Sequence, residues 1–148
     1  MKLPGNRDKK IIDGTHRIVF YLLPLLGLAF LLWYIKNAAC DVVYSDYIRL
    51  VNSYLPDVFN PEKFFVADVL TRIPINYLSR IINVKFFGFS ITFDRVLGAV
   101  SVSLAAWCFA AYSRQLKINI KWFITFMIVM FSLNKWEMLT NGSGWSHF

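Results

Sequence analysis

Five charged residues in this chain are of types that could carry chemistry at a membrane surface. Asp41 and Asp46 follow an apolar run, and a carboxylate there could coordinate a divalent cation or accept a proton from an acceptor hydroxyl. Arg72 and Arg80 are candidates to bind the phosphate of a lipid carrier. Glu137 is a candidate substrate-binding residue, because ionisable groups near membrane depth are functional by default.

These residues also have plainer explanations. The two aspartates can be solvated acids beside a headgroup layer, or helix caps, since surface carboxylates are mostly exposed. The arginines can neutralise nearby acids or lipid headgroups. Residue type alone leaves both interpretations open, so the elements that position these side chains matter.

Apolar runs are the strongest signal in the sequence. Hydrophobic residues make up 57% of the 148 residues and aromatic residues 18%, which is more than is usual for a soluble domain. Two runs, 18–35 and 95–113, are each long enough to cross the hydrocarbon core of a bilayer. The second is rich in small residues, which let helices approach closely in lipid, so we expect it to have helical neighbours.

A third run, 122–139, is weaker because lysines flank its apolar core. It crosses the membrane if Lys121 and Lys135 extend toward the headgroups. The sequence therefore predicts an all-α fold with about three transmembrane helices in a single membrane domain. Its parts are a tail 1–17, spans 18–35, 95–113 and 122–139, a long loop 36–94, a turn 114–121 and a tail 140–148.

Positive charge is concentrated beside the apolar runs. Residues 1–17 carry five bases and two acids, 114–121 carry three bases and no acid, and 36–94 carry six of each. Lys and Arg gather on the cytoplasmic side of membranes. We therefore expect a cytoplasmic N-terminus and an external loop, in a bacterial inner (plasma) membrane. The same distribution explains the basic character of the chain without a nucleic-acid partner.

The long loop is predicted to be helical. Apolar residues in 44–55 and 64–73 follow helical spacing, and prolines end both runs. Asn60, Pro61 and Glu62 form a good helix start, with a capping side chain, a proline in the first turn and an acid near the positive end of the dipole. Another helix is expected over 75–83. We expect these amphipathic helices to lie along the membrane surface.

Three motifs follow one another toward the second span. Thr71–Leu78 contains the pattern basic–x–Pro–apolar–x–aromatic, Phe86–Ser90 reads apolar–Phe–Gly–apolar–Ser, and Arg95–Leu97 reads Arg–apolar–Leu. In their order and spacing, over roughly 18–114, they resemble the N-terminal part of polytopic membrane glycosyltransferases of the C-type superfamily. Members of that superfamily have many more than three spans. The resemblance therefore implies that the chain is the N-terminal part of a larger bundle, the product of a split gene, or a degenerate relative.

The resemblance implies transfer of a sugar from a polyprenyl-phosphate donor to an acceptor at the external face. Asp46 falls where such enzymes place an acid after the first span, so it would act as the base or as a ligand of a divalent cation. Tyr47 stands where they often carry a second acid, and Asp41 is the neighbouring candidate. Arg72 and Arg80 would face the donor phosphate. The implied partners are the bilayer, the lipid-linked sugar and further transmembrane helices of the same or another chain.

A non-enzymatic membrane protein is the second interpretation. The chain would be a small accessory or scaffold subunit whose loop helices bind a partner, or a component of a translocase for lipid-linked sugars. The missing second acid favours this interpretation. An open reading frame with further spans beyond Phe148 would instead support the enzyme.

The charge distribution predicts that Asn60 lies outside the cell. In a variant with its native cysteines replaced and Asn60→Cys introduced, a membrane-impermeant thiol reagent should label intact cells, because the loop 36–94 faces outward. Labelling that occurs only after lysis would reverse the predicted orientation.

Overall fold

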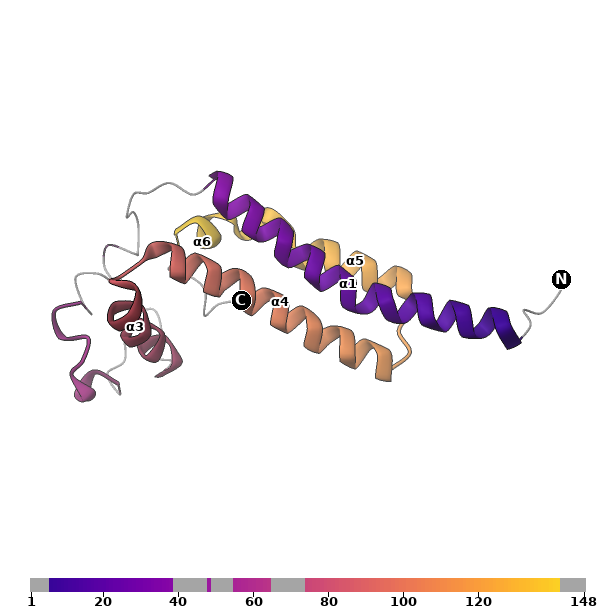
Figure 1. Cartoon of the computed structure of the whole chain (residues 1–148), viewed down its shortest axis with the longest axis horizontal. Coiled ribbons are helices and arrows are strands. Elements are labelled where there is room, and N and C mark those ends of the chain that lie inside the picture. Colours follow the sequence, from indigo (N-terminus) through magenta and orange to yellow (C-terminus); the bar gives the residue numbers. More distant parts are fainter. Residues whose placement is uncertain (1–5, 39–47, 49–54, 65–73, 142–148) are drawn as a thin grey trace.

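The computed structural model describes residues 6–38, 48, 55–64 and 74–141, and every regular element in these ranges is helical (Figure 1). The all-α prediction is therefore confirmed for them. The elements are α1 (Asn6–Ala38), η1 (Leu55–Asp57), η2 (Pro61–Phe64), α3 (Pro74–Phe87), α4 (Ile91–Gln115), α5 (Ile120–Met130), η3 (Leu133–Lys135) and α6 (Trp136–Asn141). α1, α4 and α5 lie side by side and form the helical unit, and α3 lies beside the start of α4.

Two helices of the unit are long and apolar enough to cross a membrane. They are the 22-residue segment Arg17–Ala38 of α1 and the 25-residue α4. At 1.5 Å per residue these helices measure about 33 and 37 Å, against about 30 Å for the hydrocarbon core. They contain the predicted spans 18–35 and 95–113. α1 continues through Pro24 without a break.

The predicted third span, 122–139, is not one helix. α5 ends at Met130 after 11 residues, or about 16 Å, which is roughly half of the hydrocarbon thickness. Its last turn tightens where the Ser132 hydroxyl donates to the Val129 carbonyl over 2.7 Å. The chain then runs through η3 into α6, whose Leu139 is buried in the core.

The turn between α4 and α5 reverses the chain within four residues, Leu116–Asn119. The Ile118 N–H donates to the Ser113 carbonyl over 2.9 Å, and Lys117 adopts a positive φ of 53°. The Asn119 side chain then caps α5 by accepting a hydrogen bond from the Lys121 N–H over 3.0 Å. This tight turn lies within the predicted turn 114–121.

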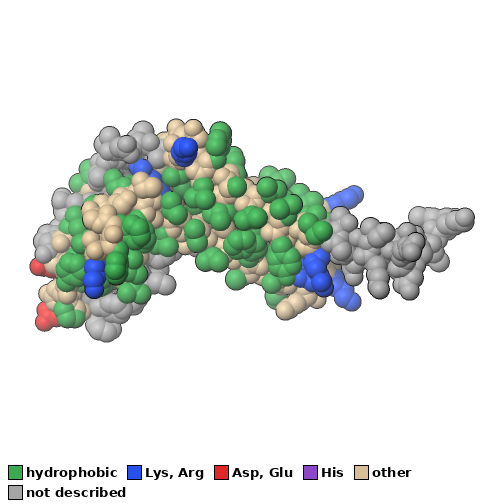
Figure 2. Space-filling model, in the orientation of Figure 1, with side chains coloured by type: hydrophobic (Ala, Val, Ile, Leu, Met, Phe, Trp, Pro, Cys, Tyr) green, Lys and Arg blue, Asp and Glu red, His purple; other side chains and the backbone are tan. Residues whose placement is uncertain are grey.

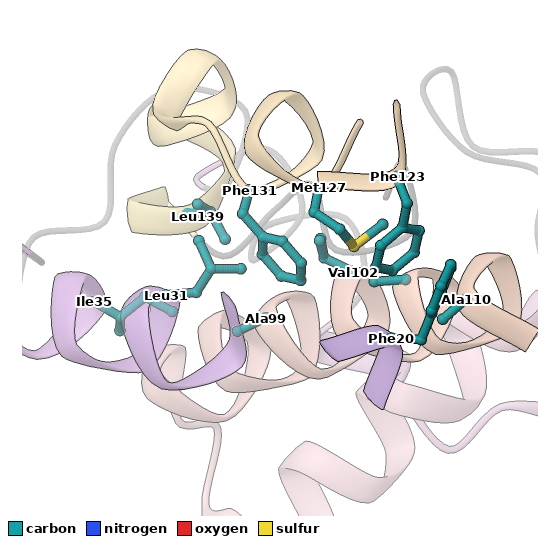
Figure 3. Close-up of a cluster of buried hydrophobic side chains, with 11 residues drawn as sticks. Phe20, Leu31, Ile35, Ala99, Val102, Ala110, Phe123, Met127, Phe131 and Leu139 are labelled. Carbon is teal, nitrogen blue, oxygen red and sulfur yellow. The ribbon is translucent and has the colours of Figure 1, made fainter. Parts of the chain in front are cut away.

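Close packing of α1 against α4 forms the core (Figure 3). Small side chains recur along the buried face of α4 at intervals of three and four residues, which is one helical face: Ala99, Ser103, Ala106, Ala110 and Ser113. The buried face of α1 has the same periodicity: Phe20, Pro24, Gly27, Leu31 and Ile35. The predicted role of small residues in bringing helices together is confirmed by this burial.

Two of the serine hydroxyls on α4 are satisfied within the helix itself, whereas the buried Ser113 hydroxyl has no hydrogen-bond partner among the described residues. The Ser101 hydroxyl donates to the Leu97 carbonyl over 2.8 Å, and the Ser103 hydroxyl donates to the Ala99 carbonyl over 2.9 Å. Such bonds remove the cost of unpaired donors in an apolar medium. α4 can therefore carry serines and still present an apolar surface.

The structure describes part of the predicted loop helices. Asn60 Oδ1 accepts a hydrogen bond from the Glu62 N–H over 3.0 Å, so the predicted helix start is confirmed, and η2 begins at Pro61. The predicted helix 75–83 is confirmed within the longer α3. Most of the predicted helices 44–55 and 64–73 lies outside the described residues.

Phe131 packs directly on the backbone of α1 at Gly27. A Cβ at Gly27 would overlap the Phe131 ring, which is buried. Gly27→Ala should lower the free energy of unfolding by about 1 kcal/mol, because overpacking of about 1–3 kcal/mol exceeds a gain of about 1 kcal/mol in helix propensity. Denaturant titration in mixed micelles measures this change.

The matched variants for that experiment are Phe131→Leu with Gly27→Ala, which should recover stability, and Ala29→Ser, which adds one atom on an exposed face of α1. If Gly27→Ala alone is as stable as the unchanged protein, the contact with Phe131 is not tight.

Candidate functional site

Buried polar side chains gather around the start of α4, which contacts both α3 and α6, and we call this group the polar cluster. Each member is at most 6% exposed, although the surrounding chain is apolar. Burying such groups is unfavourable unless they are hydrogen-bonded or paired. The members are Ser79, Arg80 and Asn83 of α3, Asp94 and Arg95 of α4, and Thr140 of α6.

The Arg80–Asp94 ion pair is the charged centre of the polar cluster. Arg80 Nη1 lies 2.6 Å from Asp94 Oδ2, and the two side chains are 7% and 0% exposed. Asp94 is in the first turn of α4, where the helix dipole favours a negative charge. The pair joins α3 to α4 across 14 positions of sequence.

Asn83 holds the connection between α3 and α4. Its fully buried side chain donates to the Ser90 carbonyl over 3.0 Å and accepts from the Ser90 N–H over 2.7 Å. Gly88 and Phe89 between them both have positive φ, 60° and 65°. Ser90 then caps α4 by accepting a hydrogen bond from the Phe93 N–H. These bonds fix the angle between α3 and α4.

Arg95 and Tyr77 attach two further segments to this end of the molecule. The Arg95 Nε–H donates to the Thr140 carbonyl and so ties α6 to α4. The Tyr77 hydroxyl lies 2.6 Å from the Val58 carbonyl oxygen and 2.7 Å from that of Asn60, which holds the η1–η2 segment against α3. The polar cluster therefore joins α3, α4 and α6, and Tyr77 adds the η1–η2 segment.

The outward face of α3 is apolar, and its inward face is polar. Leu78, Phe86 and Phe87 are exposed, with Phe86 70% exposed, while the buried side of the helix carries the polar cluster. Lys85 lies over the Phe86 ring, 5.7 Å from its centroid. This pattern is the reverse of that of a helix on a soluble protein. It fits the expected placement along a membrane surface, where lipid would cover the apolar face.

Of the predicted site residues, the structure describes the side chain of Arg80. It neutralises Asp94, which is one of the two interpretations given for it, and its phosphate-binding role stays a prediction. Asp41, Asp46 and Arg72 lie outside the described residues. Glu137 lies on α6, and its side chain is not among those described.

The predicted divalent cation has no candidate cluster among the described residues. No group of three or more His, Cys, Asp or Glu side chains comes together there. Asp46, the predicted ligand, lies outside them, so its role stays a prediction.

Sequence reasoning missed Asn83 and Asp94. The sequence does place Asp94 and Arg95 next to an apolar run, and charged residues beside a span often have partners. Their partners, however, lie on other helices, and helical spacing does not reveal such contacts.

Comparison with known proteins gives no relatives: no family model, no curated protein and no solved structure matches this chain.

The geometry of the ion pair predicts strong coupling between Arg80 and Asp94. Asp94→Asn or Arg80→Met alone should each cost about 3–5 kcal/mol of unfolding free energy, because each leaves a buried group without its partner. The double variant should cost clearly less than the sum of the two. Unfolding of all four proteins in mixed micelles gives the coupling energy.

Lys85→Gln is the matched control, since it removes an exposed base from the same helix and should change stability by less than about 0.5 kcal/mol. Single-variant effects that add within about 0.5 kcal/mol would mean that the two residues are not coupled.

Proposed function

We propose that the chain is an integral membrane protein and the N-terminal part of a membrane glycosyltransferase. In this proposal it moves a sugar from a lipid-phosphate donor to an acceptor at the external face of a bacterial plasma membrane. The membrane part is supported by the surface of the helical unit, and the glycosyltransferase part by the arrangement of the residues that carry the resemblance.

The surface of the helical unit supports insertion into lipid. Large apolar side chains are exposed along all three of its helices, and apolar side chains cover the middle of the molecule in Figure 2. Soluble monomers rarely expose contiguous apolar surfaces of this extent. Examples are Leu22, Leu25 and Leu26 on α1, Leu104 on α4, and Ile128 and Val129 on α5.

The ends of the helical unit differ in charge, which supports the proposed orientation. Arg17, Arg114, Lys117 and Lys121 lie where α1 enters the unit and where α4 turns into α5. The opposite end carries both signs of charge: the exposed acids Asp57 and Glu62 lie in η1 and η2, and the exposed base Lys85 lies on α3. The positive-inside tendency then favours a cytoplasmic basic end and an external α3.

One observation carries the glycosyltransferase proposal: the described residues of the three motifs, from Pro74 onward, form a single structural unit. Pro74 begins α3, and Tyr77 anchors the preceding segment. Gly88 makes the turn between the helices, Ser90 caps α4, and Arg95 ties down α6. Residues that the resemblance groups by order in the sequence are thus grouped in space, at the proposed external end.

The non-enzymatic alternative is favoured by the closed ion pair. Arg80 is buried and forms an ion pair with Asp94. In this arrangement it holds α3 in place. An accessory or scaffold subunit needs such a rigid external element and no free phosphate-binding group. Direct assay of sugar transfer separates the two functions.

Asp46 is the residue whose loss should reduce transfer most. Asp46→Asn keeps the size of the side chain and removes its charge, so transfer should fall by about 10²–10⁴-fold if a general base is lost. The measurement is sugar transfer from a polyprenyl-phosphate donor in membranes that hold the complete protein.

Asp41→Asn is the control, because Asp41 is a neighbouring acid without the motif match. Full transfer by Asp46→Asn together with loss of transfer in Asp41→Asn would move the site to Asp41. If neither substitution changes transfer, the accessory-subunit function replaces the enzyme.

A further inference from the structure

The basic end of the helical unit is defined here as Arg17 and Tyr21 of α1, Arg114 of α4, Lys117 of the turn and Lys121 of α5. These residues come from three helices and one turn. α1 and α4 run antiparallel, so the end of α4 lies beside this part of α1, where Arg114 contacts Tyr21 (Figure 1). Residues 1–17 and 114–121 together hold eight bases and two acids. By sequence, these two segments therefore account for most of the net charge of +7.

Tyr21 holds the Arg114 guanidinium in a fixed position. Arg114 Nη1 donates a hydrogen bond to the Tyr21 hydroxyl, and the guanidinium carbon lies 5.3 Å from the centroid of the Tyr21 ring. The Trp107 indole N–H donates to the Tyr21 carbonyl over 3.2 Å, which fixes this part of α1 against α4. A guanidinium has five N–H donors, so this contact leaves donors for an anion.

The other bases of this end are close to Arg114 in sequence or on a helical face. Arg17 lies one turn before Tyr21 on the same face of α1. Lys117 follows Arg114 by three residues in the left-handed turn, and Lys121 is in the first turn of α5. All three are exposed. An anion beside Arg114 would therefore have further positive charges within reach.

Exposed aromatic side chains mark the depth of these bases. Trp122, beside Lys121, is 72% exposed, and Tyr112 is 58% exposed. Exposed Trp and Tyr residues at the end of an apolar helix are typical of the boundary between hydrocarbon and headgroups. The bases then lie at the level of the phosphates.

We propose that the basic end binds the phosphate of an anionic phospholipid, with Arg114 and Arg17 on either side of it and Lys117 and Lys121 around it. Arg114 supplies directed N–H donors, and the lysines supply point charges. The apolar outer faces of α1 and α5 would accept the acyl chains. This inference needs the chain to be inserted in a membrane, but it does not depend on sugar transfer.

The first experiment measures which lipids stay on the protein. The full chain is reconstituted in equimolar phosphatidylglycerol and phosphatidylcholine and extracted, and the retained lipids are quantified by mass spectrometry. The unchanged protein should retain phosphatidylglycerol in excess. Lys117→Gln with Lys121→Gln should lower this excess about fivefold per base, which corresponds to about 1 kcal/mol per base at a charged surface.

Lys85→Gln is the matched control, because Lys85 is an exposed base at the opposite end of the molecule. It should leave the excess of phosphatidylglycerol unchanged. An equal loss in Lys85→Gln, or an unchanged excess in the double variant, overturns the proposal. Both substituted lysines are exposed, so neither result depends on a change in the core.

A second variant separates a localised site from the general field of the charged end. Arg114→Gln with Gln115→Arg keeps the net charge but moves the guanidinium away from Tyr21. This variant should lose the excess of retained phosphatidylglycerol, as Arg114→Gln alone does. If it keeps that excess, the proposal of a localised site at Arg114 is overturned. Excess inorganic phosphate during the wash should not displace the lipid, and complete displacement would mean that the site takes the free anion instead.

Discussion

The close approach of α1 and α4 is the constraint on which the rest of the structure depends. The facing side chains on α4 are mostly alanine and serine, so two long helices can pack with little side chain between them. Lipid offers no hydrophobic driving force for helix association, and dispersion contacts between close helices have to supply it. Phe20 and Phe123 extend this contact to α5, with ring centroids 4.2 Å apart. The other elements are positioned relative to the pair of helices α1 and α4, and so is the start of α4 that carries Asp94.

The polar cluster gives orientation more than stability. Bringing Arg80 and Asp94 out of water costs energy that their attraction repays only with good geometry. What the pair and the Asn83 bonds add is direction, because each is satisfied when α3 leaves α4 at one angle. The exposed apolar face of α3 is a consequence of this orientation. The polar side of α3 packs against the rest of the protein, and its apolar side is exposed.

Local patterns in the sequence predicted the elements better than the contacts between them. Apolar runs identified the spans in α1 and α4, and the Asn60–Glu62 start and the helix at 75–83 followed from local rules. The segment 122–139 is not one continuous helix, because hydropathy counts residues and does not register the tight turn at Ser132 or the packing of Phe131 on Gly27. The contact of Phe131 depends on α1, because Gly27 lies about a hundred positions away in sequence.

The same distinction applies to the site. Arg80 was identified from its type, but its partner Asp94 was assigned to the end of a loop, since hydropathy places a charged residue outside a span. In the structure α4 begins at Ile91, so Asp94 is already inside the helix and buried. The capping of α4 by Ser90 sets this boundary, and it could be read only once the turn at Gly88 was known.

The turn at Gly88 and Phe89 also has a mechanical consequence. Two successive residues with positive φ, bridged by both hydrogen bonds of the Asn83 side chain, leave this elbow little freedom to bend. A molecule that binds the exposed side of α3 would therefore meet a surface whose direction is already set by its connection to α4.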